Sequence, residues 1–366
     1  MVNTIKQSPL AEIHRTLDAK MTEFAGYELP LYFKGFKQEH LHTRSKASLF
    51  DISHMGQFEL SGANLIRSLE KLVPADLRQL KNNHSVITVL LNEQAGVIDD
   101  VMLTRLGNSF RLVANGAQKY KVFELLQTQL DDSVQLNHQE DYAFIALQGP
   151  KAEAVLDQFN PDIKQMKFLM ADHFELAGIN CFVSRTGYSG EDGYEISIKA
   201  EFAEQLVKLL LEHTEVEPAG LGARDSLRLE AGLCLYGHEL NESITPVEAG
   251  MGWMIAKSRR NDNSEFNGKK IILEQLNDGI EKLRMGLAIE GKVPVREGAV
   301  LFDESNKEIG FVSSGVFSPS LNYPIAQAYI DVAYTNMGTI LKVQVRNKTI
   351  TVRVSALPFI KLNYKK

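Results

Sequence analysis

The spacing of apolar and turn-forming residues changes near residue 280, and this change limits the possible fold more than any other feature. Before that point, segments with helical spacing alternate irregularly with short β-like runs. After it, short strand-like runs are separated by Gly, Pro and Asn, and almost no helical periodicity remains. Short strands spaced in this way are typical of a barrel or a sandwich. The chain is therefore expected to end in an all-β domain, after a linker around Asn277-Asp278-Gly279.

The part of the chain before residue 280 is predicted to contain both helices and strands. Amphipathic helices are expected where apolar residues recur at helical spacing, over 8–20, 63–72, 117–130, 151–159 and 201–212. Short β-like runs lie between them, at Ser85–Leu91, Val97–Arg105, Phe110–Ala114, Ala143–Leu147, Asn180–Arg185 and Tyr194–Ile198. Because these elements do not follow a regular β-α-β alternation, the predicted fold class is α+β rather than a doubly wound sheet.

Length and charge limit the number of domains and the kind of partner. A chain of 366 residues is too long for one ordinary core, so two or three domains are expected. Its 40 Lys and Arg against 46 Asp and Glu give a net charge of −6, which argues against a nucleic-acid partner. No apolar run approaches the roughly 20 residues that span a bilayer, so no membrane association is expected. Residues 1–10 resemble neither a secretory signal nor an Arg-rich presequence, and the cytoplasm is the expected location.

Familiar catalytic and metal motifs are incomplete in this chain. Cys181 and Cys234 form no Cys-x-x-Cys pair, so two buried free thiols are expected. His40 and His42 could share one face of a strand, but no third ligand completes a set. Solvated surface histidines, and no metal site, are expected there. Gly220-Leu221-Gly222 lacks the third glycine of a dinucleotide loop and predicts a turn.

Two adjacent carboxylates, Asp99 and Asp100, lie inside the apolar run Val97–Leu103. Alternation along a strand sends one of them to each face. A desolvated carboxylate is costly unless it is paired or its shifted pKa serves proton transfer. The structural alternative is that one caps a turn and the other faces water. The flanking residues do not distinguish the two carboxylates.

Two further charged residues allow both a functional and a structural interpretation. Glu195 could accept two parallel N–H bonds from a guanidine-like edge of a heterocycle, or it could be an ordinary exposed strand residue. Arg224 follows glycines that let the backbone approach a ligand, so its guanidinium could meet a carboxylate or a carbonyl. A salt bridge to Asp225 or Glu230 is the competing interpretation of Arg224.

Taken together, these segments and several others resemble the glycine cleavage T-protein family in the same order over nearly the whole chain. The resemblance rests on Phe50–Gly56, Asn92–Leu103, Ser184–Glu195, Pro218–Asp225, Leu233–Gly237, Thr245–Gly250, Ser313–Pro319 and Leu357-Pro358-Phe359. One such fragment would be weak support, whereas their shared order is specific.

The resemblance implies a fold and a reaction. The implied fold is a three-domain cloverleaf around a central folate channel, with two mixed α/β domains interleaved in sequence and a C-terminal β-barrel domain. The corresponding limits are 1–55 with 140–226, 56–139 with 227–276, and 277–366. In the implied reaction, the methylene carbon of aminomethyl-dihydrolipoyl H-protein passes to the co-substrate tetrahydrofolate. The products are 5,10-methylenetetrahydrofolate, ammonia and dihydrolipoyl H-protein. The implied partners are lipoylated H-protein, folate and the other glycine cleavage components.

The resemblance also assigns roles to particular residues. Asp100 matches the family's catalytic aspartate, the second of the Asp-Asp pair, which would orient the folate and stabilise developing positive charge. Glu195 matches the residue that binds the amino-pyrimidine edge of the pterin. The other matches to the folate site are Arg224, the C-terminal Tyr364, and the channel-lining Met55, Asn115 and Tyr188.

Departures from the family pattern and rival functions complete these expectations. Ile87 stands where many relatives have Tyr, so one channel hydroxyl is missing. Three other positions also depart from the family pattern: Ala95 replaces a usual Gly, Tyr27 a Trp and Lys361 a Pro. The alternatives on this scaffold are a folate-dependent demethylase and a folate-binding iron–sulfur assembly factor. The assembly factor carries Lys-Gly-Cys where this chain reads Gly232-Leu233-Cys234, and demethylases usually differ around the aspartate. We therefore expect a tetrahydrofolate-dependent aminomethyltransferase of glycine catabolism and one-carbon metabolism.

Overall fold

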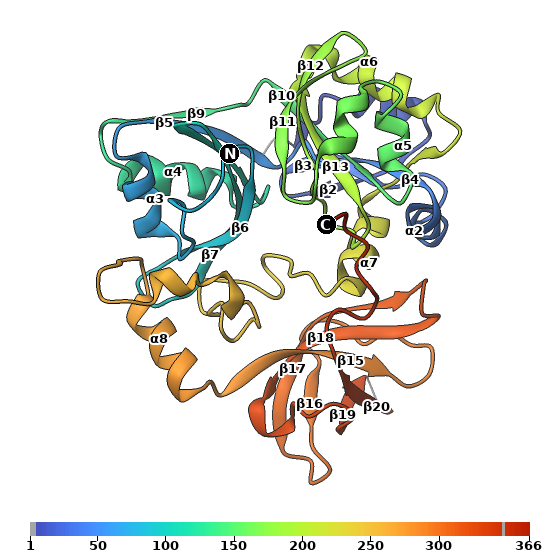
Figure 1. The fold of residues 1–366 in the computed structure, drawn as a ribbon. Coiled ribbons are helices and arrows are strands. Elements are labelled where there is room, and N and C mark those ends of the chain that lie inside the picture. The colour runs from blue at the N-terminus through green and yellow to red at the C-terminus, as the bar shows by residue number, and fades with distance from the viewer. Residues whose placement is uncertain (1–4, 346–347) are drawn as a thin grey trace.

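Three lobes surround the centre of the molecule in a computed structural model that describes residues 5–345 and 348–366 (Figure 1). Two lobes mix helices with sheets, and the third is a closed barrel of strands. A long segment with little regular structure, residues 231–268, runs between them. The predicted α+β class with a C-terminal barrel is confirmed.

The first lobe is built on a six-stranded sheet whose strands are far apart in sequence. The strand order is β11-β12-β13-β10-β4-β14. The strands are β4 (Ala47–Asp51), β10 (Tyr142–Gln148), β11 (Ala171–Leu176), β12 (Ile179–Ser184), β13 (Gly193–Lys199) and β14 (Val216–Pro218). A small sheet beside it has the order β1-β3-β2, from β1 (Lys6–Gln7), β2 (Lys20–Phe24) and β3 (Tyr27–Tyr32). The helices of this lobe are α1 (Ala11–Thr16), α2 (Phe36–Ser45), α5 (Ala152–Leu156), α6 (Ala200–Leu211) and α7 (Leu221–Glu230).

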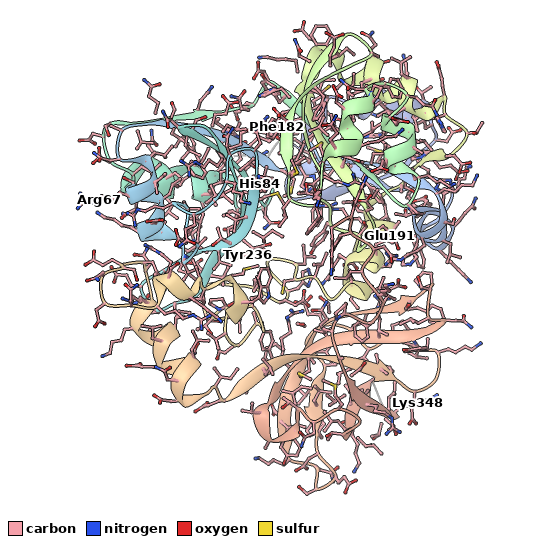
Figure 2. All side chains as sticks on the ribbon, in the orientation of Figure 1. Arg67, His84, Phe182, Glu191, Tyr236 and Lys348 are labelled. Atoms are coloured by element: carbon pink, nitrogen blue, oxygen red, sulfur yellow. The ribbon has the colours of Figure 1, made fainter. Side chains whose placement is uncertain are left out.

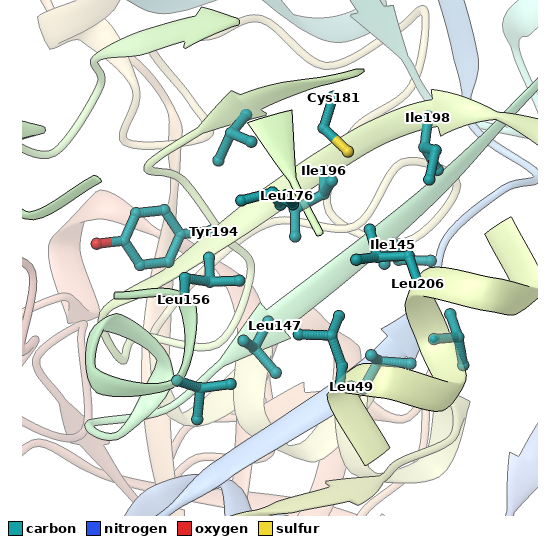
Figure 3. Packing of buried hydrophobic residues seen from close by; sticks show 14 of the residues in the cluster. Leu49, Ile145, Leu147, Leu156, Leu176, Cys181, Tyr194, Ile196, Ile198 and Leu206 are labelled. Atoms are coloured by element: carbon teal, nitrogen blue, oxygen red, sulfur yellow. The ribbon is translucent and has the colours of Figure 1, made fainter. Parts of the chain in front are cut away.

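The core of the first lobe lies between this sheet and the helices α5 and α6 (Figure 3). Helix α6 turns one apolar face, Ala203, Leu206, Val207 and Leu210, onto the sheet, as its spacing predicts. The facing residues of β10 and β13 alternate in the same way, with Ile145, Leu147, Ile196 and Ile198 fully buried. Burying side chains of this size stabilises each position by about 1.5–3 kcal/mol.

The second lobe is inserted between β4 and β10 in sequence and holds a five-stranded sheet. Its strand order is β6-β7-β8-β5-β9. The strands are β5 (Gly56–Gly62), β6 (Ser85–Leu91), β7 (Val97–Leu106), β8 (Ser109–Ala114) and β9 (Val134–His138). Helices α3 (Leu65–Leu72) and α4 (Lys119–Gln129) pack on this sheet, and α8 (Lys269–Asp278) ends just before the barrel.

The third lobe is a closed barrel with the strand order β15-β18-β17-β16-β19-β20. The strands are β15 (Lys282–Ile289), β16 (Val300–Phe302), β17 (Glu308–Ser318), β18 (Tyr323–Asp331), β19 (Ile340–Val345) and β20 (Lys348–Ser355). After β20 the chain leaves the barrel and returns to the first lobe. There the N–H of Asn363 donates to the carbonyl of Gly190 at 2.9 Å, and the N–H of Phe168 donates to the carbonyl of Lys365 at 2.8 Å. We keep the proposed domain limits as our assignment, with the addition that the tail packs on the first lobe.

A buried ion pair joins helix α7 to the long central segment, and a hydrogen bond links the same carboxylate to the barrel. The guanidinium of Arg228 donates to Oε2 of Glu239 at 2.7 Å, and the two side chains are 2% and 0% exposed. Ser313 of β17 donates to the other oxygen, Oε1, at 2.7 Å. Each oxygen of Glu239 therefore has a buried donor, and the carboxylate ties two lobes together.

Replacing Glu239 by Ala is expected to reduce the free energy of unfolding by about 3–5 kcal/mol, because the change leaves the guanidinium of Arg228 buried without its main partner. Chemical denaturation measures the loss. Glu308→Ala, at an exposed position that begins the same strand β17, is the control and should change stability by less than about 0.5 kcal/mol. Equal effects of the two changes would contradict a structural role for the buried pair.

Two local predictions for the N-terminal part of the first lobe were wrong. The expected helix over 8–20 is shorter, because Lys20 already belongs to strand β2. His40 and His42 were expected on a solvated strand, but both lie in helix α2, and His40 is fully buried. The imidazole of His40 contacts Ser226 Oγ at 2.7 Å, Ser320 Oγ at 2.9 Å and Glu230 Oε2 at 3.1 Å. Those partners lie far from His40 in sequence, so its spacing to His42 could not reveal them.

Candidate functional site

A cavity of about 880 Å³ lies where the three lobes meet. Residues from β2, β7, β13, α7, the long central segment and the barrel all contribute to its wall. Tyr236, which lines it, is labelled near the centre of the molecule in Figure 2. Ligand-binding cavities commonly occur between domains and have volumes of roughly 300–1,000 Å³. The cavity is therefore the candidate site.

Six of the seven residues singled out from sequence line this one cavity. They are Met55, Asp100, Asn115, Tyr188, Glu195 and Arg224. Tyr364 is not part of the cavity wall. Its ring stacks on Phe168, with 4.2 Å between the ring centroids and 6° between the planes. The structure thus brings together residues from both mixed lobes and places the predicted C-terminal tyrosine elsewhere.

The two carboxylates of β7 differ in burial. Asp99 is fully buried, whereas Asp100 is partly exposed and faces the cavity. Opposite Asp99 the β6–β7 pairing contains an irregularity, because Leu90 pairs with Asp99 whereas Leu91 pairs with Val97. Such a bulge re-aims the side chains next to it. Of the two, Asp100 is therefore the residue that can contact a ligand.

Burial raises the pKa of both carboxyl groups. The pKa of Asp100 rises to about 6, since desolvation outweighs the opposing hydrogen bond from Asn115. Burial, followed by the charge of Asp100, raises the pKa of Asp99 well above its usual value. Asp100 is therefore ionised at neutral pH but close to its titration range, as suits a group that handles charge or protons.

Asp100→Asn is expected to stabilise the fold at neutral pH. The pKa of Asp100 is about 6 in the folded protein, above the ordinary value of 3.8, so folding favours the protonated form. As the pH rises from about 4 to 6, the carboxyl group ionises and the free energy of unfolding falls. Removing the charge should recover on the order of 1–3 kcal/mol at pH 7.5, seen as a rise of a few degrees in Tm. The gain should shrink as pH falls from 6 toward 4. A gain that stays constant over this range would contradict the raised pKa.

Glu195 presents a carboxylate from the centre of the first lobe's sheet. It lies on β13, between β10 and β12, and is only 9% exposed. Thr186 Oγ1 donates to its Oε2 at 2.6 Å, and the described part of the chain supplies no donor to Oε1. Burial raises the pKa of Glu195, and the Thr186 hydrogen bond and the charge of Arg224 oppose the rise. A ligand that offers N–H donors would satisfy the remaining oxygen.

Arg224 lies in the first turn of helix α7, not in the loop that its glycines had suggested. The alternative salt bridges do not form, because Asp225 pairs with Arg228, and Glu230 pairs with Arg44 and His40. The guanidinium carbon of Arg224 lies 4.8 Å from the ring centroid of Tyr188, whose hydroxyl donates to the carbonyl of Cys234. Within the described residues Arg224 has no carboxylate partner, so its charge is available to a ligand.

Several residues of the cavity wall were not assigned from sequence. His54 is buried, and desolvation, with Arg224 and Lys119 nearby, lowers its pKa to about 3, so its imidazole is neutral. Trp253 is 68% exposed at this wall. The run Met251-Gly252-Trp253-Met254 is a signal that could have found it, since apolar residues there follow a glycine without any helical or strand period. Ile87 also lines the cavity, in place of the expected tyrosine hydroxyl.

Three further features concern metal ligands, membrane-spanning helices and the cysteines. Residues 5–345 and 348–366 contain no group of three His, Cys, Asp or Glu side chains placed to hold a metal ion. Among the helices described in these ranges, none is both long enough and apolar enough to cross a membrane. Cys181 and Cys234 are buried with free thiols, as expected.

Family models match both parts of the chain. Residues 10–259 match the model described as the GCVT N-terminal domain, and residues 282–361 match the glycine cleavage T-protein C-terminal barrel domain. The second match contains the closed barrel, and the first covers most of both mixed lobes.

Known proteins match this chain over nearly its whole length. The mitochondrial aminomethyltransferase of Dictyostelium discoideum is 43% identical over 385 residues, covering 100% of this chain and 94% of its own. The aminomethyltransferase of Anoxybacillus flavithermus is 39% identical over 364 residues, covering 98% and 99%. The crystal structure of glycine cleavage system aminomethyltransferase T from Bartonella henselae matches with a TM-score of 0.94 at 40% identity, covering 99% of this chain and 100% of that one. The fold is that of an aminomethyltransferase. The chain belongs to the glycine cleavage T-protein family.

Proposed function

We propose that this protein transfers the methylene carbon of aminomethyl-dihydrolipoyl H-protein to tetrahydrofolate. The products are 5,10-methylenetetrahydrofolate, ammonia and dihydrolipoyl H-protein. The observation that carries the proposal is the Asp100 carboxylate, which faces a cavity whose wall also holds Glu195 and Arg224. Among the described residues, Glu195 Oε1 has no donor and Arg224 has no carboxylate partner. Full-length similarity to aminomethyltransferases supports the same reaction.

The residues of the cavity fit a pterin. The amino-pyrimidine edge of a pterin offers parallel N–H donors, which match a carboxylate with a free oxygen such as Glu195. Arg224 would bind an acceptor of the same ligand, and Tyr188 would hold the guanidinium over its ring. Met55 and Ile87 supply apolar wall, and the large cavity leaves room for more than one ring.

Asp100 would act on the reacting end of the folate. Its ionised carboxylate can orient the folate nitrogens and stabilise positive charge that develops as the carbon is transferred. Its pKa of about 6 also lets it accept or return a proton near neutral pH. Buried His54, which is neutral, adds no competing positive charge to this end of the cavity.

The partners and the location follow from the proposed reaction. Lipoylated H-protein and the remaining glycine cleavage components are the proposed protein partners, and no metal, nucleic acid or membrane is proposed. We keep the cytoplasm as the proposed location; the relatives include a mitochondrial protein from Dictyostelium discoideum and one from the bacterium Anoxybacillus flavithermus.

One assay tests the proposed function against its alternatives. Aminomethylated H-protein is supplied with and without tetrahydrofolate, and ammonia release is measured. Release that depends on folate supports aminomethyl transfer. Absence of folate-dependent release overturns it, and folate-dependent demethylation of a methylamine or sulfonium substrate would identify the rival enzyme.

A further inference from the structure

Asp99 is fully buried, yet its carboxylate is held on both oxygens by a single neighbouring residue. Asn115 donates from its backbone N–H to Oδ2 of Asp99 at 3.0 Å and from its side-chain Nδ2 to Oδ1 at 2.8 Å. Two bonds from one residue fix both its backbone and its side chain. The carboxamide of Asn115 therefore has one preferred orientation.

The same carboxamide also reaches Asp100. Nδ2 of Asn115 donates to Oδ1 of Asp100 at 2.8 Å, with a further contact to the backbone carbonyl of Asp100 at 3.2 Å. The strand geometry explains why one amide meets both carboxylates. Pairing between β7 and β8 begins at Met102 and Val113, so Asn115 follows the end of β8 and lies beside the start of β7, which pairs with β6 but not with β8.

We infer that Asp99 is a positioning residue: it holds the carboxamide of Asn115 so that this amide orients the carboxylate of the catalytic Asp100 toward the cavity. This inference rests on the proposed function and deepens it. Asn115 then serves the reaction through Asp100, in addition to lining the cavity. Asp99, which does not line the cavity, takes part without contacting the ligand.

Apart from Asp99, the titratable groups around Asp100 do not change charge in the pH range where Asp100 titrates. Apart from Asp99 on the same strand, the titratable groups whose charge couples to Asp100 are Tyr188, Cys234 and Tyr236. Burial raises the pKa of Cys234 and of Tyr236 to about 12 and that of Tyr188 further still. These three side chains stay neutral between pH 4 and 9, so changes in that range report the carboxyl pair.

Two possible roles of Asp99 shift the titration of Asp100 in opposite directions. If Asp99 acts through Asn115, Asp99→Asn puts an NH₂ group against one of the two N–H donors of Asn115 and loosens the amide. Asp100 then loses a donor that favours its ionised form, and its pKa rises. If Asp99 acts only as a nearby negative charge, removing that charge lowers the pKa of Asp100.

The experiment compares the unsubstituted protein with Asp99→Asn, Asn115→Ala and the double variant. The titration of Asp100 is followed by carbon-13 NMR of labelled aspartate carboxyls, with the Asp100 signal assigned by its absence in Asp100→Asn. In parallel, ammonia release from aminomethylated H-protein gives kcat, and its dependence on tetrahydrofolate gives KM.

The expected result is an upward shift of the Asp100 midpoint by about half a pH unit or more in both single variants. In Asp99→Asn, which does not alter the cavity wall, kcat should fall by about 10- to 100-fold with the KM for tetrahydrofolate nearly unchanged. The kcat of the double variant should be no lower than that of Asn115→Ala. A downward or absent shift in Asp99→Asn, or additive losses in the double variant, overturns the inference. Because NMR needs no turnover, failure of the proposed reaction would appear separately, as an unsubstituted protein that releases no folate-dependent ammonia.

Discussion

Asp100→Asn is expected to reduce turnover by roughly 10²–10⁴-fold while tetrahydrofolate binds within about twofold of its original affinity. Asn keeps the size of the side chain and can still accept a hydrogen bond from Asn115. It cannot carry the negative charge or exchange a proton, so the loss should fall on the chemical step. Single-turnover ammonia release and a folate titration by fluorescence or calorimetry separate the two effects.

Asp132→Asn, an exposed position in the same lobe, is the matched control for this change. It should leave both turnover and folate affinity unaltered. Loss of affinity in Asp100→Asn comparable to the loss of turnover would instead make Asp100 a binding residue. Because the same variant is expected to be more stable than the parent at neutral pH, unfolding cannot account for its lost turnover.

Glu195→Ala should have the opposite profile and weaken tetrahydrofolate binding by roughly 30- to 1,000-fold. A charged, buried acceptor that meets two N–H donors contributes about 2–4 kcal/mol, and truncation also leaves the ligand's donors unsatisfied. At saturating folate, kcat should fall much less, since the carboxylate that contacts the reacting end is intact. Equilibrium folate binding and the KM for folate measure the effect.

Two companion variants sharpen the test of Glu195. Glu195→Gln keeps the shape but offers one acceptor oxygen, so its affinity should lie between the parent and Glu195→Ala. Glu175→Ala removes an exposed carboxylate from β11, which lies two strands away from β13 in the same sheet, and should leave folate affinity unchanged. Unchanged folate affinity in Glu195→Ala would rule out the pterin-edge assignment.

Much of the fold could be predicted because local pattern and tertiary structure agree. Ser85–Leu91 forms strand β6 with the predicted bounds, and the change of sequence pattern near residue 280 coincides with the end of α8 at Asp278. Helix α7 was missed because Gly220 and Gly222 resemble a turn. Both glycines serve close packing: a Cβ at Gly220 would lie 2.5 Å from the backbone of Leu31, and one at Gly222 would lie 3.0 Å from Phe36.

The candidate site was only partly accessible from residue chemistry. An apolar strand with two carboxylates indicated an unusual pair, but the choice of Asp100 came from the family resemblance, and burial in the structure supports it. For Arg224, local sequence favoured salt bridges to Asp225 or Glu230. Those bridges are absent because Arg228, Arg44 and His40, positioned by helix packing, take the same carboxylates. Competition among distant partners of this kind is set by tertiary structure.

The interleaving of the first two lobes has a consequence for synthesis on the ribosome. Strand β4 is translated early, yet its partners β10 and β14 end at Gln148 and Pro218. The five strands of the second lobe, in contrast, are contiguous from Gly56 to His138 and can assemble as they emerge. The nascent chain therefore carries β4 without its full set of partner strands until Pro218 has left the exit tunnel. During that interval the unpaired strand edges of the N-terminal segment are exposed to aggregation.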